Sequence, residues 1–331
     1  MEQTNPYIKQ FPEIMRGKKI LYVHGFGSSG QSGTVARLRE VLPHAEVTAP
    51  DLPIHPAEAM QLLRDLCAKE QPSLIIGTSM GGMYAEQLHG FDRILVNPAL
   101  QMADTMKEHG MTGAQQFSNP RADGVQEFIV TKALVKEYKE TTEQCFADTS
   151  GEEQQRVWGL FGDEDTTVNT YGLFRAHYAQ AVRFHGEHRM NDKSFMHSVM
   201  PVIRWIDDRQ EKRERPIIYI DMNTLIDKWG KPQGAAQKAV RLLLEHYQLH
   251  FVAAAPDDDR HYTEMREWLY QYINVPAHGH TTFTNQKHLL YGDYLIDAEE
   301  TEGMATLIRF GSDTFKTWDE IIEYFSRLGG Q

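Results

Sequence analysis

The sequence LIIGTSMGG, residues 74–82, runs from an apolar strand pattern into Gly-x-Ser-x-Gly and then into a helical pattern. In a strand-turn-helix of this kind the serine sits in a strained turn from which its hydroxyl projects at the end of a sheet. Gly77 and Gly81 leave room for the neighbouring backbone, which a larger side chain would block. The stretch therefore predicts a nucleophile elbow with Gly77 and Gly81 around Ser79.

Short β-branched runs alternate with helical patterns on both sides of this stretch, which is typical of a parallel sheet with covering helices. The predicted strands are 20–23, 46–49, 73–76, 93–96, 157–161 and 182–185, and the predicted helices are 34–42, 57–69, 83–89, 171–180 and 195–206. Segment 101–155 breaks the rhythm. We expect it to be a helical lid above the strand ends, the alternative being an insertion without substrate contact.

A serine hydroxyl needs a base that takes its proton and an acid that holds the base in the right tautomer. Residues 161–168, FGDEDTTV, place Asp165 on a loop after a predicted strand, and residues 182–188, VRFHGEH, end the next strand at His188. The order serine, acid, histidine is that of α/β hydrolases. We therefore predict Ser79, Asp165 and His188 as the catalytic residues.

Three neighbouring residues compete for these two roles. Asp163 and Glu164 precede Asp165 on the same loop, and His185 precedes His188. Asp163 is the main substitute for the acid.

The oxyanion of a tetrahedral intermediate needs backbone donors, each of which stabilises the transition state by about 3 kcal/mol. Met80 follows the nucleophile directly, and Phe26 lies in the sequence HGFG at 24–27. We expect the N–H groups of Phe26 and Met80 to form this oxyanion hole, the alternative for HGFG being a turn chosen only for geometry. The following SSGQSG, 28–33, is not a Walker loop, because no Lys-Ser or Lys-Thr closes it.

The first two thirds of the chain resemble a known family of hydrolases. The resemblance is carried by HGFGSSGQSG, PDLP at 50–53, GTSMGG, VNPA at 96–99, LFGDEDTTV and a final Gly-x-His, and it spans about residues 18–207. These motifs are similar to those of the YqiA-like esterase family. The resemblance implies a small α/β-hydrolase fold that cleaves acyl esters or acyl-CoA thioesters, with Ser79, Asp165 and His188 as its triad and no cofactor.

A charged run, DDRQEKRER at 207–215, precedes Pro216 and is typical of a solvated linker. We therefore expect a hydrolase domain at 1–209 and a second domain at 210–331. In the second domain the predicted strands are 217–220, 250–254, 281–284, 294–296 and 306–310, and the predicted helices are 233–247, 262–272 and 318–328. The pattern predicts a second, smaller α/β sheet.

The second domain resembles the haloacid dehalogenase superfamily, in particular its 5′-deoxyribonucleotidase branch. The resemblance is carried by PIIYIDMNTL at 216–225, Lys287, LID at 295–297, IRFG at 308–311 and Trp318. It implies a Rossmannoid fold in which the first aspartate, Asp221, accepts a phosphoryl group and Asp297 helps to hold Mg²⁺.

Three positions depart from that family pattern. Asn223 stands where the family has an acid, Ala254 where it has a phosphate-binding hydroxyl, and Ala298 where a further acid is common. An amide cannot protonate a leaving group. We therefore expect a vestigial phosphatase site at Asp221, Asn223, Lys287 and Asp297, in a scaffold that packs or dimerises. The alternative is that Asp221 and Asp297 still bind Mg²⁺.

The amino-acid composition limits the kinds of molecule that the protein is expected to bind. The formal charge of −12 opposes binding to nucleic acid and to anionic membranes, and no apolar run is long enough to span a bilayer. Two cysteines without ligand spacing, Cys67 and Cys145, predict a reduced, cytoplasmic setting. We expect a small acyl ester or thioester as substrate, and any homo-oligomer to form through the second domain. The rival hypotheses are a nucleotide-acting or phosphate-ester-acting protein that works through the second domain, and two binding modules without catalysis.

Overall fold

The computed structural model describes residues 8–277 and 279–328. The chain divides into two compact units, Met1–Asp207 and Asp208–Gln331, and each has a parallel sheet of its own. The α/β class predicted from the sequence is thereby confirmed for both parts of the chain.

The first unit is built on six parallel strands. In their order across the sheet they are β2 (Glu46–Thr48), β1 (Lys19–Val23), β3 (Leu74–Thr78), β4 (Arg93–Val96), β7 (Val157–Gly162) and β8 (Ala181–Phe184). The central strands are buried along their length, which explains their continuous apolar runs. Because all six run in the same direction, their carboxyl ends lie at one edge of the sheet, where chemistry is usually placed in such folds.

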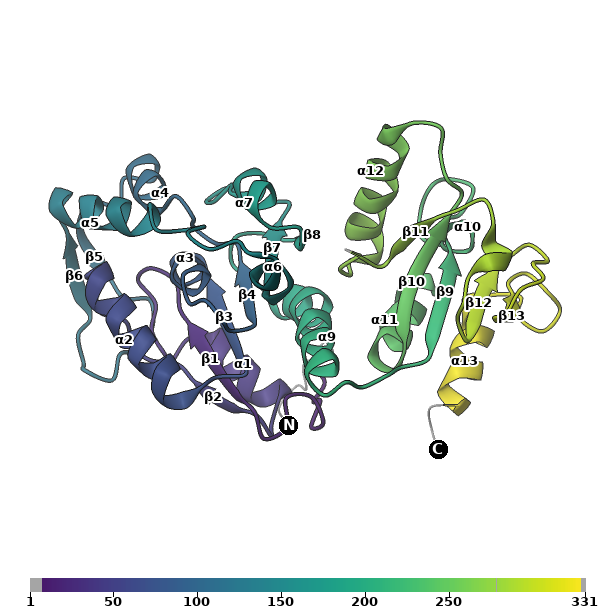
Figure 1. Ribbon diagram of the computed structural model, residues 1–331, viewed down its shortest axis with the longest axis horizontal. Helices are drawn as coiled ribbons and strands as arrows, with labels where there is room; N and C mark the ends of the chain where they lie inside the picture. The colour runs from purple at the N-terminus through teal and green to yellow at the C-terminus, as the bar shows by residue number, and fades with distance from the viewer. Residues whose placement is uncertain (1–7, 278, 329–331) are drawn as a thin grey trace. The chain divides into compact units, whose positions relative to one another are not determined.

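Helices pack around this sheet (Figure 1). They are α1 (Gly33–Val41), α2 (Pro56–Glu70), α3 (Met80–Glu86), α7 (Tyr171–His177), α8 (Asp192–Ser194), the π-helical turn Phe195–Val199 and α9 (Met200–Gln210). Helix α2 begins with Pro56, which needs no hydrogen-bond acceptor in a first turn, and ends before Gln71 in the left-handed conformation. Helix α3 is short and wholly buried, so the segment after Ser79 is held rigidly.

The expectation of a helical lid at 101–155 is wrong in one respect, because the segment contains a β-hairpin. Its elements are α4 (Met102–Glu108), β5 (Gly113–Gln116), β6 (Glu127–Val130), α5 (Lys132–Thr142) and α6 (Gly151–Arg156). Strand β6 alternates exposed and buried residues, as a half-buried strand does. Its Phe128 packs edge-on against Phe26 at 5.2 Å between ring centres. The hydroxyl of Tyr138 donates to Met80 Sδ over 3.2 Å.

A buried charged cluster stabilises the first unit where α6 meets β4 and α3. Arg93 is fully buried and donates to the carboxylate of Glu153 and to the Glu86 carbonyl. The carboxylate of Glu86 accepts from the hydroxyl of Tyr178 over 2.7 Å. A buried charge of this kind persists only when it is paired and hydrogen-bonded, so the cluster links the sheet to α3 and α6.

The second unit holds five parallel strands. Across the sheet they are β11 (Thr281–Phe283), β10 (Gln248–Ala253), β9 (Ile217–Asp221), β12 (Tyr294–Asp297) and β13 (Thr306–Arg309). The helices are α10 (Met222–Leu225), α11 (Ala236–His246), α12 (Asp259–Trp268) with the π turn Leu269–Ile273, the 3-10 turn Lys287–Leu289, and α13 (Trp318–Leu328). Apolar faces of α11 and α13 fill the core between them and the sheet.

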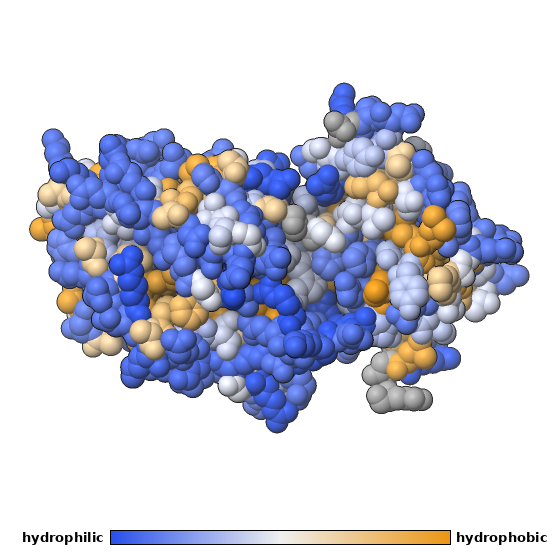
Figure 2. Space-filling model, viewed as in Figure 1, coloured by the Kyte–Doolittle hydropathy of each residue, from blue (hydrophilic) through white to orange (hydrophobic). Residues whose placement is uncertain are grey.

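The surface is mainly hydrophilic on the face shown in Figure 2, with apolar residues gathered in small groups. Within residues 8–277 and 279–328, no helix combines the length and the apolar character that a bilayer crossing demands.

Candidate active site

Ser79 occupies the sharp turn between β3 and α3. Its backbone has φ 53° and ψ −120°, a strained conformation for a residue with a side chain. The turn requires glycine at positions 77 and 81, because neighbouring backbone atoms occupy the space that a side chain would need. A Cβ at Gly77 would lie 2.3 Å from the Gly81 carbonyl oxygen, and a Cβ at Gly81 would lie 2.0 Å from that of Val23. The elbow thus depends on both glycines, as the sequence pattern predicts.

His188 connects the serine to a carboxylate. Its Nε2 lies 3.1 Å from Ser79 Oγ, and its Nδ1 lies 2.8 Å from Asp165 Oδ2. A carboxylate only accepts, so Nδ1 carries the proton and Nε2 is left to accept from the serine hydroxyl. Three residues far apart in the chain thus form one line of hydrogen bonds.

Asp165 is held by backbone donors as well as by the imidazole. Its Oδ1 accepts from the N–H groups of Thr167 and Val168 over 2.8 and 2.9 Å, and its side chain is 3% exposed. Burial by itself would raise the pKa of Asp165, but the bonds from His188 and from the two amides outweigh burial and lower the pKa. The carboxylate is therefore ionised when it faces the imidazole.

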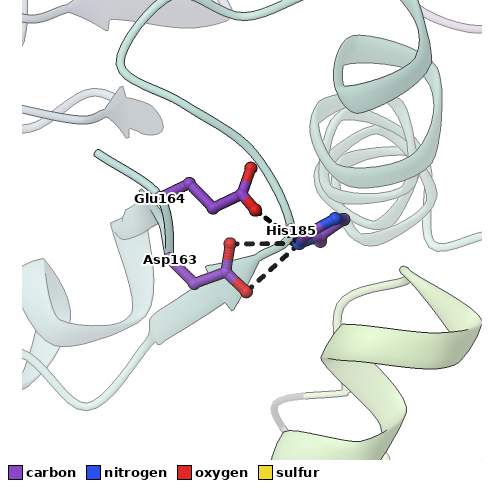
Figure 3. Close-up of side chains that lie close together, drawn as sticks. All are labelled: Asp163, Glu164 and His185. Atoms are coloured by element: carbon purple, nitrogen blue, oxygen red, sulfur yellow. Dashed lines mark hydrogen bonds and ion pairs between the residues drawn. The ribbon is translucent and has the colours of Figure 1, made fainter. Parts of the chain in front are cut away.

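The three rival residues form a separate cluster, which Figure 3 shows. His185 Nδ1 lies 3.3 Å from Asp163 Oδ1 and 3.9 Å from Glu164 Oε1, and Asp163 Oδ1 also accepts from the Gly186 N–H. All three are more exposed than Asp165, and in the described chain none of them bonds to Ser79 or His188. Among the residues described, this is the one group of three or more that could hold a metal ion.

Two backbone amides next to Ser79 are available as donors. Met80 is the first residue of α3, so its N–H has no acceptor within the helix. The N–H of Phe26 donates to no group in the described ranges. A Cβ on the neighbouring Gly25 would lie 3.3 Å from Ser79 Cβ, which shows how closely this loop approaches the nucleophile. The loop thus lies close to Ser79, and Phe26 and Met80 stay the predicted donors of the oxyanion hole.

His24 shapes that loop from behind. Its Nδ1 lies 2.8 Å from the Gly25 carbonyl oxygen, and its Nε2 is 3.1 Å from the N–H of Leu52, from which it accepts. Only a neutral imidazole can make both bonds. Burial lowers the pKa of His24, which favours this neutral form.

Asn97 is a site residue that sequence reasoning missed. It follows β4 with φ 45° and is 2% exposed. Its Nδ2 donates to the carbonyl oxygens of Glu187 and His188 over 3.1 and 3.0 Å, and its Oδ1 accepts from the Gly162 N–H over 2.7 Å. One side chain therefore ties the end of β7, which leads into the loop that holds Asp165, to the segment of His188. The only sequence signal was its place at the end of a strand, in VNPA.

A cavity of about 650 Å³ opens beside Ser79. The β1–α1 loop, the start of α1 and the segment after His188 form part of its wall. The insertion contributes Met102, Thr105, Met111, Ser118 and Asn119. The lining mixes apolar and hydroxyl-bearing side chains, which suits a small polar molecule.

The second unit brings together all four residues of the predicted vestigial site. Lys287 Nζ lies 3.0 Å from Asp221 Oδ2 and 2.6 Å from Asp297 Oδ2, and the N–H of Asn223 donates to Asp221 Oδ1 over 2.8 Å. Burial raises the pKa of Asp221. Burial lowers the pKa of Lys287, but its bonds to both carboxylates outweigh this effect and raise it.

These contacts bear on Mg²⁺ binding. Carboxylate oxygens are suitable ligands, but each oxygen of Asp221 and Asp297 already accepts a bond from the protein. Lys287 thus supplies the positive charge that a cation would bring to this pair.

Curated relatives match a part of the chain. A protein of Vibrio phage KVP40 named "Putative 5'(3')-deoxyribonucleotidase" is 28% identical over 151 residues, which cover 36% of this chain and 89% of that protein. A Staphylococcus epidermidis protein of the same name is 27% identical over 105 residues, covering 28% of this chain and 59% of its own length. These names agree with the resemblance stated for the second domain.

Solved structures match more than half of the chain at low sequence identity. The esterase domain of a Rhodothermus marinus protein has 13% identity and a TM-score of 0.38, covering 61% of this chain and 90% of that one. An extracellular α/β-hydrolase from a Paenibacillus species has 11% identity and a TM-score of 0.34, covering 54% and 96%. The model of the uncharacterised protein family UPF0227 matches residues 19–206, more than half of the chain. The chain therefore belongs to the UPF0227 family.

Proposed function

We propose that the first unit is a serine hydrolase that cleaves carboxylic esters or acyl thioesters through an acyl-enzyme. The single observation that carries this proposal is the line of hydrogen bonds from Ser79 through His188 to Asp165. The strained backbone at Ser79 and the unpaired amides beside it support the same chemistry, because such amides stabilise a developing oxyanion.

The reaction proceeds in two halves. Ser79 Oγ attacks the acyl carbon as its proton passes to His188 Nε2, and the carbonyl electron pair moves onto the oxygen facing Phe26 and Met80 N–H. The pair then returns, the bond to the alcohol or thiol breaks, and the imidazolium protonates the leaving group. Water repeats the sequence on the acyl-enzyme and releases the acid. Every proton and charge in this scheme is handled by protein groups, so it requires no cofactor.

Replacing the nucleophile tests the proposal. We expect Ser79→Ala to lower kcat on p-nitrophenyl valerate by about 10⁴-fold or more, because the attacking group is lost. The matched control is Ser150→Ala, at an exposed serine whose side chain makes no capping hydrogen bond to α6. A fluorophosphonate probe should label the peptide that contains Ser79. Undiminished hydrolysis by Ser79→Ala would refute the mechanism. Comparing an oxygen ester with its thioester then identifies the preferred leaving group.

The second unit has an alternative function as a phosphate-ester or nucleotide site. The names of the curated relatives and the assembly of Asp221, Lys287 and Asp297 favour it, whereas Asn223 in place of the acid opposes turnover. We expect no Mg²⁺-dependent phosphate release from a deoxynucleoside monophosphate. Release that disappears in Asp221→Asn would establish the alternative.

The two cysteines bear on the cellular location of the protein. Cys67 and Cys145 are free thiols, and burial raises the pKa of Cys67 to about 11, which keeps that thiol protonated and inert. Free thiols accord with a cytoplasmic location. Any self-association through the second unit would be seen by sedimentation of the full chain.

A further inference from the structure

The cavity beside Ser79 reaches the start of α1. Gly33 and Thr34, the first two residues of this nine-residue helix, both line the cavity. Their N–H groups have no acceptor in the part of the chain described, since no side chain caps the helix. Unpaired amides at a helix start carry the positive end of the helix dipole and favour a negative ligand.

A buried hydroxyl lies at the same place without a partner. Ser32, the residue before the helix, lines the cavity and is 7% exposed. Its Oγ makes no hydrogen bond within the described residues. The nearby phenol of Tyr22 is bonded to Thr78 Oγ1 over 2.8 Å. Burial raises the pKa of Tyr22, and the hydroxyls of Thr78, Thr34 and Ser32 around the phenol oppose this rise, so Ser32 lies near a phenol that is already bonded. A buried hydroxyl without a partner is unfavourable, and an acceptor in the cavity would satisfy it.

The charges around the cavity leave one cation uncompensated. Arg37 is engaged by both oxygens of Asp192, each at 2.8 Å, and this pair holds the segment after His188 against α1. Arg189, on that same segment, also lines the cavity and makes no ion pair or hydrogen bond in the described chain. A guanidinium is a strong partner for carboxylate or phosphate.

We infer that Ser32, the first amides of α1 and Arg189 form a subsite for an anionic group, carboxylate or phosphate, on the substrate. The inference rests on the proposed function and narrows it to esters or thioesters that carry such a group near the scissile bond. The amides and the hydroxyl would receive the anion's oxygens, and Arg189 would supply the charge. The acyl carbon would then meet Ser79.

Two matched esters test this preference. The full chain is assayed with mono-p-nitrophenyl glutarate and with p-nitrophenyl valerate, which have equal acyl length and differ in a terminal carboxylate. We expect kcat/KM to favour the glutarate ester by about tenfold, and Arg189→Gln to remove most of this ratio, because a charge-assisted bond contributes about that factor. Ser32→Ala should lower the ratio about threefold. Arg260→Gln, at an exposed arginine of the second unit, makes the same charge change and should preserve it.

Inhibition of p-nitrophenyl valerate hydrolysis distinguishes a carboxylate site from a phosphate site. This test applies whether the charged group of the substrate lies on its acyl side or on its leaving-group side. Glutarate and inorganic phosphate are compared at constant ionic strength, since screening alone alters exposed charges. The stronger inhibitor identifies the class, and Arg189→Gln should weaken it about tenfold.

These assays distinguish failure of the subsite proposal from failure of the hydrolase proposal. The subsite is overturned if the ratio of kcat/KM for the glutarate ester to that for the valerate ester is near one, if Ser32→Ala and Arg189→Gln leave this ratio unchanged, and if neither anion inhibits. The hydrolase proposal stands in that case, provided that hydrolysis still depends on Ser79. A ratio shifted equally by Arg260→Gln also overturns the subsite. Absence of hydrolysis and of fluorophosphonate labelling at Ser79 overturns the hydrolase itself.

Discussion

Replacing Asp165 by asparagine should trap His188 in a tautomer that cannot act as the base in the proposed mechanism. Oδ1 of Asp165 accepts from the backbone N–H groups of Thr167 and Val168. In Asp165→Asn these donors would fix the oxygen of the new amide in that place and turn its NH₂ group toward His188 Nδ1. The imidazole must then accept at Nδ1 and carry its proton on Nε2, where it can no longer take the proton of Ser79.

The size of the effect follows from this geometry. The base is lost while the nucleophile, the oxyanion donors and the cavity remain, so we expect kcat to fall by about 10³- to 10⁴-fold with KM nearly unchanged. Steady-state hydrolysis of p-nitrophenyl valerate measures both constants. Asp163→Asn is the matched control, because Asp163 pairs with His185 outside the triad. Full activity of Asp165→Asn, or an equal loss in Asp163→Asn, would refute the assignment of the acid.

The lowered pKa of Asp165 predicts that the free energy of unfolding depends on pH, and Asp165→Asn tests this. The folded-state pKa of Asp165 is lowered, so its charged form stabilises the fold above its unfolded pKa of about 4, and this stability is lost as the pH falls through the folded value. The difference in free energy of unfolding between wild type and Asp165→Asn should therefore be largest near neutral pH and shrink below about pH 4. Urea unfolding at several pH values measures it, and a difference that grows in acid would contradict this reasoning.

Three further substitutions probe the frame of the site. Asn97→Ala should lower kcat by about 10²-fold with little change in KM, because it releases the loops of acid and base; parallel kinetics and melting curves separate this from unfolding. Gly81→Ala should destabilise the fold by about 3 kcal/mol in urea unfolding, since its Cβ meets the Val23 carbonyl, and an unchanged midpoint would argue against the close contact. Arg93→Met should cost about 3–5 kcal/mol by stranding Glu153, and a smaller loss would show that water reaches this carboxylate.

The sheets were the most predictable part of the molecule. Each strand of the first sheet begins and ends within two residues of its predicted range, because buried parallel strands are continuous apolar runs bounded by loops. The meeting of Ser79, Asp165 and His188 could also be anticipated, since the carboxyl ends of parallel strands share one edge of the sheet.

Other features depend on contacts that no local pattern encodes. Strand β6 is only four residues long, and its alternation becomes visible only once Phe128 is seen to pack on Phe26. Asn97 ends a strand like many loop residues, and its role arises from two loops more than sixty residues further along the chain. Ser32 was included in the proposed anion subsite because its buried hydroxyl makes no hydrogen bond within the described residues, and this cannot be predicted from the sequence.

The lysine between Asp221 and Asp297 has a consequence for the stability of the second unit. An ammonium group bonded to both carboxylates is a covalently tethered counter-ion that cannot be chelated, diluted or exchanged. The repulsion between two buried acids is thus relieved by the chain itself. The pairing of these two carboxylates therefore requires no magnesium ion.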